Sequence, residues 1–470
     1  MSSPLLNSTA PLPIRFVIVG GGISGLSAAY TLCKAGHEVR VLEKAPGLGY
    51  PSSGIRVPPN MSKILKKWVG KEELDKLAVL NVASPCIDIN SGVCIGVTPW
   101  EPTVMAETGG EFLMMKHEDV HRLVYRLAIS AGAEVNFGVS VANVSPGSPT
   151  PCVTLSSGET IDTDVVIGAD GRSSIVRPVV CDFEDNEDPC PTGTTVYSGV
   201  VAAEQLKGDP KLEHFIKSDE WAIGFGTGMT ICCFPVSAKS ELAFALFLPD
   251  ECADPSLSQS ETPESWYNSV PTSSIQPEGL ALYLRRLMLK APTLCRSQWL
   301  QRDQAEEWVD ESGRIVLLGE AAHPFPPGTT YATAAGLEDA VVLGTLFSHL
   351  SSTNQITTLL NAYQEIRETR CRILAHTDTS NASLMMLPPG PARDARDRIL
   401  SAPKNEWDED SATRKEFDGL AELFGYEAED AAMQWWVDWG RYIHDRSPTR
   451  TVSASPSLSV EKLSLSSPEC

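Results

Sequence analysis

The sequence predicts an α/β fold in which a nucleotide-binding domain is interrupted by a second, sheet-based α+β domain. A strand, a glycine-rich turn, a helix and another strand follow one another in residues 14–43. Short apolar strands bounded by glycine or polar residues recur at 164–170 and 314–318, while 194–300 carries a series of β-strand patterns. An insertion between distant parts of one α/β domain accounts for this order.

The first unit, residues 14–43, has the order of a Rossmann-type dinucleotide-binding motif. The apolar run Phe16–Val19 predicts a buried strand, and apolar residues at helical spacing predict a helix over Ser24–Ala35. A second strand over Glu38–Leu42 ends on Glu43, whose carboxylate can accept hydrogen bonds from ribose hydroxyls. The unit therefore predicts a dinucleotide site, without deciding which dinucleotide.

The glycines between the first strand and the helix fit the pattern G-x-G-x-x-G. Gly20 allows the tight turn, Gly22 lets the backbone approach a pyrophosphate, and Gly25 lets the helix pack on the strand. The helix would begin near Ile23 and Ser24, where free N–H groups and the positive end of the helix dipole favour phosphate. We expect all five residues to contact the cofactor.

Composition limits the classes of partner. The 470 residues carry a formal net charge of −22, which argues against nucleic acid or an anionic membrane as a partner. The first 13 residues lack the basic and apolar segments of a signal peptide, and no apolar run approaches a membrane span. The 12 cysteines show neither zinc spacing nor a disulfide framework, so we expect a cytoplasmic protein without a metal site.

The pattern along the chain predicts five segments. After a loose leader, they are a first part of the dinucleotide-binding domain (14–185), an inserted sheet domain (186–300), a second part of the dinucleotide-binding domain (301–385), a C-terminal helical segment (386–446) and a disordered tail (447–470).

Within these segments the patterns predict individual elements. In the sheet domain, strands are expected over Thr195–Ala202, Trp221–Gly226, Thr230–Phe234 and Leu242–Leu248, followed by a loop over Asp254–Pro277 and a helix over Gly279–Ala291. Elsewhere, helices are expected over Met61–Leu80, Asp119–Ser130, Gly336–Leu350, Thr357–Ala375 and Glu427–Ile443, with a Pro/Arg-rich connector over Pro388–Pro403.

Two further motifs make the prediction more specific. Gly168–Ser174 reads GADGRSS, and Gly319–Pro324 reads GEAAHP and is followed by Glu338-Asp339-Ala340. With the first motif, they resemble the single-component flavin aromatic hydroxylases, the family of salicylate and para-hydroxybenzoate hydroxylases. The resemblance covers about residues 14–375, and Tyr426–Trp439 is similar to the tail of the salicylate hydroxylase branch.

The resemblance implies an extended FAD whose ADP part lies on the first motif. It makes 14–185 and 301–385 the two parts of an FAD-binding domain and 186–300 a substrate-binding sheet domain. Asp170 and Gly171 would lie near the pyrophosphate and a transient NAD(P)H, and Glu320 would bind the ribityl chain. The helix after Pro327 would direct its N-terminus at the flavin ring, where it stabilises the negative charge of reduced flavin. Further residues expected in the cofactor site are Lys44, Arg56, His117, Gly328, Thr329 and Thr330.

The chain departs from the family pattern at several positions. Glu320 replaces the usual aspartate, and His117 stands where an arginine often contacts FAD. Ala332 and Ala334 replace a common Gly…Asn pair. Ser198 occupies a position near the start of the substrate domain where an arginine is often found, which weakens any inference about substrate contacts.

The leading hypothesis is an FAD-dependent monooxygenase that uses NAD(P)H and O2 to hydroxylate an aromatic substrate through a flavin C4a-hydroperoxide. One G-x-G-x-x-G indicates that NAD(P)H has no domain of its own. A phenol or hydroxybenzoate would supply the electron-rich ring. In a variant of the reaction, a hydroxybenzoate would lose its carboxylate as carbon dioxide when it is hydroxylated. No catalytic residue is assigned; Arg56 and Tyr197 are the weak candidates, and Arg56 could neutralise a substrate carboxylate.

Two alternatives stay open. The first is a flavin-dependent epoxidase or reductase that acts on an isoprenoid or another secondary-metabolite intermediate. The second is a flavin-binding protein without turnover, for which Ala332 and Ala334 are the only indication. Substrate-stimulated NAD(P)H oxidation and the mass of the product would separate the three.

Overall fold

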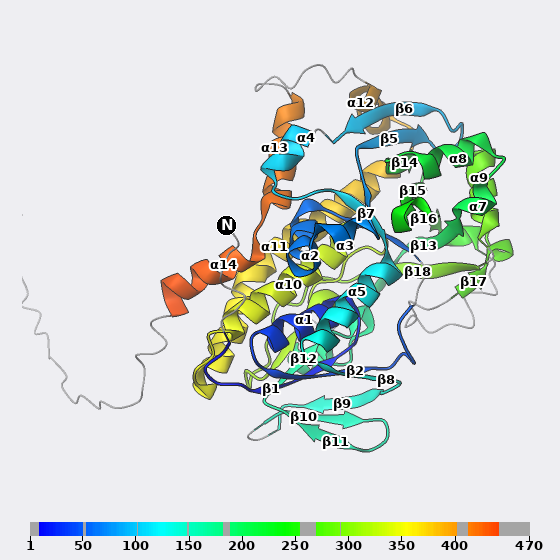
Figure 1. The fold of residues 1–470 in the computed structure, drawn as a ribbon. Helices are drawn as coiled ribbons and strands as arrows, with labels where there is room; N and C mark the ends of the chain where they lie inside the picture. The colour runs from blue at the N-terminus through cyan, green and yellow to red at the C-terminus, as the bar shows by residue number, and fades with distance from the viewer. Residues whose placement is uncertain are drawn as a thin grey trace, which may run out of the picture.

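A parallel five-stranded sheet forms the base of the molecule (Figure 1). Its strand order is β19-β12-β1-β2-β8, and the strands expected at the first, second and third motifs lie side by side in it. The strands are β1 (Arg15–Val19), β2 (Glu38–Glu43), β8 (Glu134–Phe137), β12 (Val165–Gly168) and β19 (Ile315–Leu317). The computed structural model describes residues 9–49, 53–100, 102–147, 150–181, 189–253, 269–291, 293–401 and 412–440.

Three helices pack together above this sheet: α1 (Ile23–Lys34), α5 (His117–Ser130) and α10 (Ala332–Phe347). Helix α10 is buried along almost its whole length, as its nearly continuous apolar sequence requires. The Thr31 hydroxyl of α1 donates a hydrogen bond of 2.6 Å to the Ala340 carbonyl of α10. The predicted Rossmann-type fold is therefore confirmed, with residues from both ends of the chain in one core.

An eight-stranded sheet forms the second half of the molecule. Its order is β17-β18-β13-β16-β15-β14-β5-β6, and the pairing of β14 with β5 is parallel. Two of its strands, β5 and β6, come from the segment before residue 100, so the chain enters this sheet twice; the boundaries at 185 and 300 stay predictions. The strands are β5 (Ala83–Asp88), β6 (Cys94–Pro99), β13 (Cys190–Ala202), β14 (Ala222–Phe225), β15 (Thr230–Val236), β16 (Glu241–Pro249), β17 (Ser269–Pro271) and β18 (Thr293–Gln301).

The two faces of this sheet have different partners. Short helices α7 (Ala203–Leu206), α8 (Pro210–Lys217) and α9 (Leu282–Lys290) pack on one face and enclose a separate core that includes Tyr197. The other face turns toward the cofactor motifs. Because side chains alternate along a strand, Val196 and Ser198 point to this second face.

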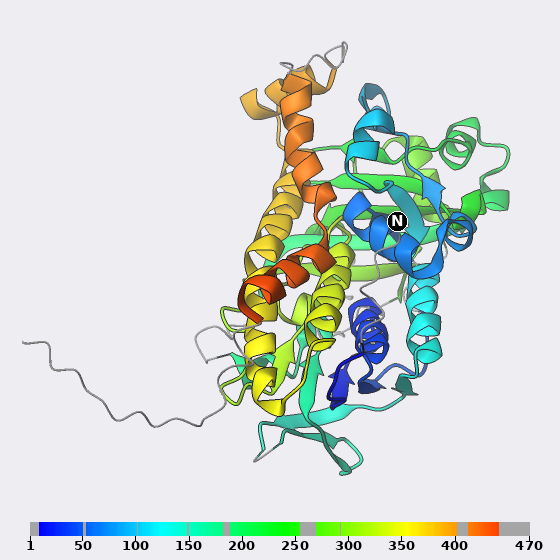
Figure 2. The same cartoon turned by 60° about the vertical axis from the view of Figure 1, so that its left-hand side comes forward.

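A 30-residue helix, α11 (Ile356–Met385), runs along the length of the molecule (Figure 2). It continues ten residues beyond the predicted end at Ala375. At its far end, the carbonyls of Met385 and Met386 accept hydrogen bonds from Gly226 and Gly228 in the turn between β14 and β15. The helix therefore links the nucleotide-binding half to the eight-stranded sheet.

The Pro/Arg-rich connector expected over Pro388–Pro403 contains a helix, α12 (Pro391–Ser401). A proline at the first position of a helix does not break it, and the Ala, Arg, Asp and Leu residues that follow are compatible with helix. The helix expected over Met61–Leu80 is also interrupted: Gly70 has φ +82° and separates α2 (Pro59–Val69) from α3 (Lys71–Asp75).

The remaining elements surround these two sheets. The helix expected over Glu427–Ile443 is α14 (Ala428–Trp435) followed by a π-helical turn at Trp436–Gly440, and residues 441–470, with the expected tail, lie outside the described residues. Most of the expected loop over Asp254–Pro277 also lies outside them. No helix among the described residues is both long and apolar enough to cross a bilayer. The other elements are β3 (Gly54–Val57), α4 (Pro102–Glu107), β4 (Val79–Leu80), β7 (Leu113–Lys116), β9 (Val141–Ser145), β10 (Cys152–Leu155), β11 (Thr160–Asp162), α6 (Arg177–Val180) and α13 (Ala412–Gly425).

Candidate cofactor-binding site

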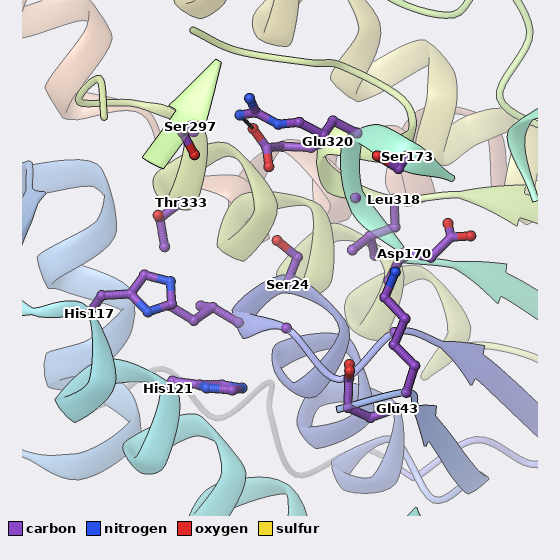
Figure 3. A pocket seen from close by; sticks show the side chains of 18 of the residues that line it. Ser24, Glu43, His117, His121, Asp170, Ser173, Ser297, Leu318, Glu320 and Thr333 are labelled. Atoms are coloured by element: carbon purple, nitrogen blue, oxygen red, sulfur yellow. Dashed lines mark hydrogen bonds and ion pairs between the residues drawn. The ribbon is translucent and has the colours of Figure 1, made fainter. Parts of the chain in front are cut away.

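A cavity of about 400 Å³ lies between the carboxyl ends of the parallel strands and one face of the eight-stranded sheet. All three motifs reach it, although about 300 residues of sequence separate the first from the third. Figure 3 shows Glu320 and Glu43 on opposite sides of the cavity, with Ser24 between them. The predicted site residues on its wall are Gly20, Gly22, Ile23, Ser24, Glu43, Lys44, His117, Asp170, Gly171, Glu320, Gly328 and Thr329.

The three glycines of the first motif have different surroundings. Gly20 has φ +107°, and a Cβ there would overlap the Ala169 backbone. A Cβ on Gly25 would overlap the Gly20 carbonyl, which explains why Gly25 packs beneath the turn and is absent from the cavity wall. A Cβ on Gly22 would meet no protein atom within 4 Å, so the space beside it is available to a ligand.

The N-terminus of α1 opens on the cavity. Its N-cap residue is Gly22, no side chain caps it, and its first turn contains no acidic residue. The first N–H groups of a helix have no intrahelical acceptor, and the helix dipole makes this end attractive to anions. The open space at Gly22 and the uncapped helix together fit a pyrophosphate.

Glu43 already holds the glycine turn. Its carboxylate accepts hydrogen bonds from the N–H groups of Gly21 (2.6 Å) and Ala45 (2.7 Å), and the side chain is buried. An ionised carboxylate has about four acceptor positions, so two of them stay available to ribose hydroxyls. Glu43 can therefore shape the turn and bind the ligand at the same time.

Two histidines of α5 form another part of the wall. The His117 and His121 ring centroids are 6.1 Å apart, and His121 Nε2 lies 2.7 Å from the Gly21 carbonyl. Burial, together with the neighbouring His121, lowers the pKa of His117 to about 4, so the ring is neutral at pH 7. The buried Nδ1 atoms of both rings have no hydrogen-bond partner, which a ligand could supply.

His121 was not predicted. The signal for it was its position four residues after His117, which places both rings on one face of the helix.

Asp170 uses its side chain within its own loop. The carboxylate accepts hydrogen bonds from Ser174 Oγ (2.5 Å) and from the N–H groups of Ile175 (2.8 Å) and Val176 (3.3 Å). Burial raises the pKa of this carboxyl. At Gly171, φ is +75° and a Cβ would meet no atom, so the backbone of this loop is open to the cavity.

Glu320 connects the third motif to the second. Its carboxylate pairs with the Arg172 guanidinium at 3.1 Å, and Arg172 also donates a hydrogen bond of 3.4 Å to the Gln298 carbonyl of β18. Arg172 was not predicted, although it stands inside the second motif. The longer side chain of Glu320, compared with aspartate, contributes to the reach of this ion pair.

Arg56 and Thr330 lie behind the cavity wall. Arg56 Nε donates a hydrogen bond to Thr330 Oγ1 (3.1 Å), and its Nη2 donates to the Gly328 carbonyl. The guanidinium also lies over the rings of Trp221 and Phe234. The contacts that the structure shows for the Arg56 guanidinium are therefore with other residues of the protein and hold it outside the cavity wall.

Tyr197, the other weak catalytic candidate, points away from the cavity. It is 1% exposed and belongs to the core on the opposite face of the eight-stranded sheet. Ser198 and, from β18, Cys295 and Ser297 face the cavity instead. Side chains alternate along a strand, so Tyr197 and Ser198 must lie on opposite faces of the sheet. The sequence alone could not tell which of the two faces borders the cavity.

The buried motif residue His323 belongs to an ion network beneath the site. Its Nε2 lies 2.6 Å from Asp339, which also pairs with Arg367 at 2.8 Å and accepts a hydrogen bond from Gly319 N–H. Among the described residues, His323, Asp339 and Cys371 are the one group close enough to hold a metal ion. The Arg367 guanidinium already neutralises Asp339, so the network fits a structural link between the third motif, α10 and α11.

Comparison with known proteins agrees with this geometry. The family model described as "FAD binding domain" matches residues 14–378, which is most of the chain. The match includes all three motifs and both halves of the cavity.

Three curated relatives are similar over most of their length. The FAD-dependent monooxygenase OpS4 of Beauveria bassiana (strain ARSEF 2860) is 26% identical, and the match covers 83% of this chain and 89% of OpS4. The 3-amino-4-hydroxybenzoate 2-monooxygenase of Streptomyces cremeus is 27% identical, with 83% and 92% covered. Hispidin-3-hydroxylase of Neonothopanus nambi is 26% identical, with 77% and 87% covered.

Solved structures share the fold. CtdE in complex with FAD and substrate has a TM-score of 0.73 at 19% identity, covering 92% of this chain and 100% of that chain. A salicylate hydroxylase substrate complex has a TM-score of 0.68 at 19% identity, covering 90% and 97%.

Proposed function

The chain belongs to the family of FAD-dependent aromatic hydroxylases, and from this we propose that it is a monooxygenase that uses FAD, NAD(P)H and O2 to hydroxylate an electron-rich aromatic ring. The observation that carries the proposal is the meeting of all three motifs at one cavity. No second G-x-G-x-x-G is present in the sequence, so NAD(P)H would reach the same cavity and leave it again.

We assign the cofactor contacts to the cavity wall. The α1 N-terminus and Gly22 would hold the pyrophosphate, and Glu43 the ribose. Glu320 would bind the ribityl chain while Arg172 fixes its carboxylate. The turn at Gly328 and Thr329 would lie at the flavin ring.

FAD, when bound, supplies the transfer of electrons from NAD(P)H to O2. The protein's part is to hold the ring of the substrate next to the flavin and to exclude water. The wall offered by the eight-stranded sheet is suited to this because Val196, Ser198, Cys295 and Ser297 are small and carry no charge. An aromatic ring can lie flat against such a surface.

The names of the relatives favour phenols. One relative is named for 3-amino-4-hydroxybenzoate and another for hispidin. Arg56 is engaged by Gly328 and Thr330, so it is not placed to neutralise a substrate carboxylate in the way the sequence had indicated. We therefore propose ring hydroxylation of a phenol ahead of decarboxylating hydroxylation of a benzoate.

The test is a panel of phenols and 2- or 4-hydroxybenzoates, each incubated with the FAD-loaded enzyme and NADH or NADPH. We expect at least one phenol to stimulate NAD(P)H oxidation and to gain one oxygen by mass. Loss of carbon dioxide with that gain would establish the decarboxylating version. Stimulation only by a non-aromatic isoprenoid would overturn the aromatic proposal in favour of an epoxidase or reductase, and no stimulation with bound FAD would indicate a flavin protein without turnover.

A further inference from the structure

The turn that leads into α10, residues 328–331, is held from two sides by oppositely charged side chains. Arg56, on β3, donates hydrogen bonds to the Gly328 carbonyl and to Thr330 Oγ1. Asp378, on α11, accepts hydrogen bonds from Thr330 N–H (3.1 Å) and Tyr331 N–H (2.8 Å). Arg56 thus donates hydrogen bonds to oxygen atoms of this turn and Asp378 accepts hydrogen bonds from its N–H groups, although the two residues are far apart in sequence.

Both side chains are buried: Arg56 is 4% exposed and Asp378 is 2% exposed. The Arg56 guanidinium lies 4.9 Å from the Trp221 ring centroid and 5.7 Å from that of Phe234. Aromatic faces attract a cation, and a buried guanidinium in such a position has little freedom to turn away. The clamp formed by Arg56 and Asp378 is therefore a fixed part of the site.

Asp378 also places a carboxylate at the N-terminus of α10, where it accepts hydrogen bonds from the N-cap residue Tyr331 and from Thr330 before it. The N-cap residue of α10, Tyr331, makes no side-chain capping hydrogen bond, and the first turn of the helix contains no acidic residue. A carboxylate at this position satisfies free N–H groups and opposes the positive end of the helix dipole. Burial raises the pKa of Asp378 to about 6, so the group is mostly ionised at pH 8.

We propose that Arg56 and Asp378 are positioning residues that fix the turn 328–331 and set the electrostatic potential at the N-terminus of α10, and thereby the reduction potential of the bound flavin. The proposal rests on the proposed function, which assigns this turn to the flavin ring. A negative charge at this point makes the added electrons less stable, while the positive charge of Arg56 makes them more stable. The two residues should therefore act in opposite directions.

The test compares flavin reduction potentials at pH 8 in four proteins: wild type, Asp378→Asn, Arg56→Gln and Asp75→Asn. Asparagine keeps the size and one acceptor oxygen of Asp378 but removes its charge. We expect Asp378→Asn to shift the equilibrium toward reduced flavin by roughly tenfold, which is about 30 mV for a two-electron couple. Arg56→Gln should shift it toward oxidised flavin. Asp75 lies exposed on α3, away from the turn. Asp75→Asn removes the same type of charge there and should leave the potential unchanged.

The outcomes are separable. If wild type binds no FAD, the proposed function fails. If wild type binds FAD and neither variant shifts the potential, or both shift it in one direction, the inference fails and the proposed function stands. A variant that loses thermal stability but keeps its potential would show a structural role alone. Arg56→Lys, which keeps the charge but cannot form the same pair of hydrogen bonds, should weaken FAD binding with a smaller change in potential than Arg56→Gln.

Discussion

At the scale of single residues, the glycines of the first motif separate ligand binding from folding. A Cβ at Gly22 meets no protein atom within 4 Å, and the backbone there has φ −70°, which any residue can adopt. A Cβ at Gly25 collides with backbone. The same type of residue thus serves the ligand at one position and the packing of the helix at the other.

Gly22→Val should fold like wild type and lose FAD. The valine side chain would fill the space that we assign to the pyrophosphate. Gly25→Val is the matched comparison and should lower the yield of folded protein, because its Cβ overlaps the Gly20 carbonyl. Flavin absorbance and circular dichroism measure the two properties. Stoichiometric FAD in Gly22→Val would contradict the placement of the cofactor.

His117 should make the stability of the apoprotein depend on pH. Its folded pKa of about 4 lies below the value of about 6.5 in an unfolded chain, so the unfolded state binds more protons between these values. The free energy of unfolding is therefore highest above pH 6.5 and falls as the pH drops toward 4. The loss from this group is at most about 3.4 kcal/mol.

Urea unfolding of the apoprotein at pH 7.5 and pH 5 checks this expectation. The variant His117→Gln should lose less stability than wild type over that interval. His376→Gln, which changes an exposed histidine of α11, is the control and should lose as much as wild type. An equal loss in all three proteins would show that His117 is not the group responsible.

At the scale of elements, the packing of α1 against α10 depends on small residues. The Thr31 hydroxyl binds the Ala340 carbonyl, and a Cβ on Gly344 would lie 2.5 Å from Thr31 Cβ. The two helices can approach this closely only because Gly344 has no side chain. Since α1 carries the glycine turn and α10 follows the turn 328–331, this contact fixes the distance between two parts of the site.

Gly344→Ala should destabilise the protein by about 1–3 kcal/mol, as overpacking of a well-packed core does. Gly419→Ala provides the contrast: it lies within α13, a Cβ there meets no atom within 4 Å, and alanine favours helix by about 1 kcal/mol. Thermal or urea unfolding should therefore move in opposite directions in the two variants. Equal effects would mean that the α1–α10 contact is loose enough to accommodate a methyl group.

At the scale of the whole molecule, the cavity lies between the two sheets, and both contribute to its wall. A ligand that binds there stabilises the folded state of both parts, by about 2.7 kcal/mol when its free concentration is a hundred times its Kd. Removal of FAD should lower the melting temperature, and its return should restore it. Calorimetry with and without FAD measures this, and an unchanged melting temperature would show that the two halves do not close on the cofactor.

The sequence determined the parts of this protein that depend on local pattern. Strand hydrophobicity and the glycine turn are properties of short segments, so the Rossmann-type fold and the cavity residues of the first motif could be predicted from them. The other expected cavity residues, such as His117 and Glu320, came from the resemblance to a family. Where an expected element differs from the structure, the reason is also local: α12 begins at a proline within the expected connector, and Gly70 interrupts the helix expected over Met61–Leu80 without altering the apolar periodicity.

Only the tertiary structure decided which way side chains point and which distant residues meet. Tyr197 and Ser198 are neighbours in sequence but lie on opposite faces of a sheet, because side chains alternate along a strand. Strands β5 and β6 pair with a sheet formed mainly by residues after 189, and Asp378 caps a turn that Arg56 holds from the other side. These arrangements follow from hydrogen bonds and packing between segments far apart in the chain, and no short stretch of sequence contains both partners.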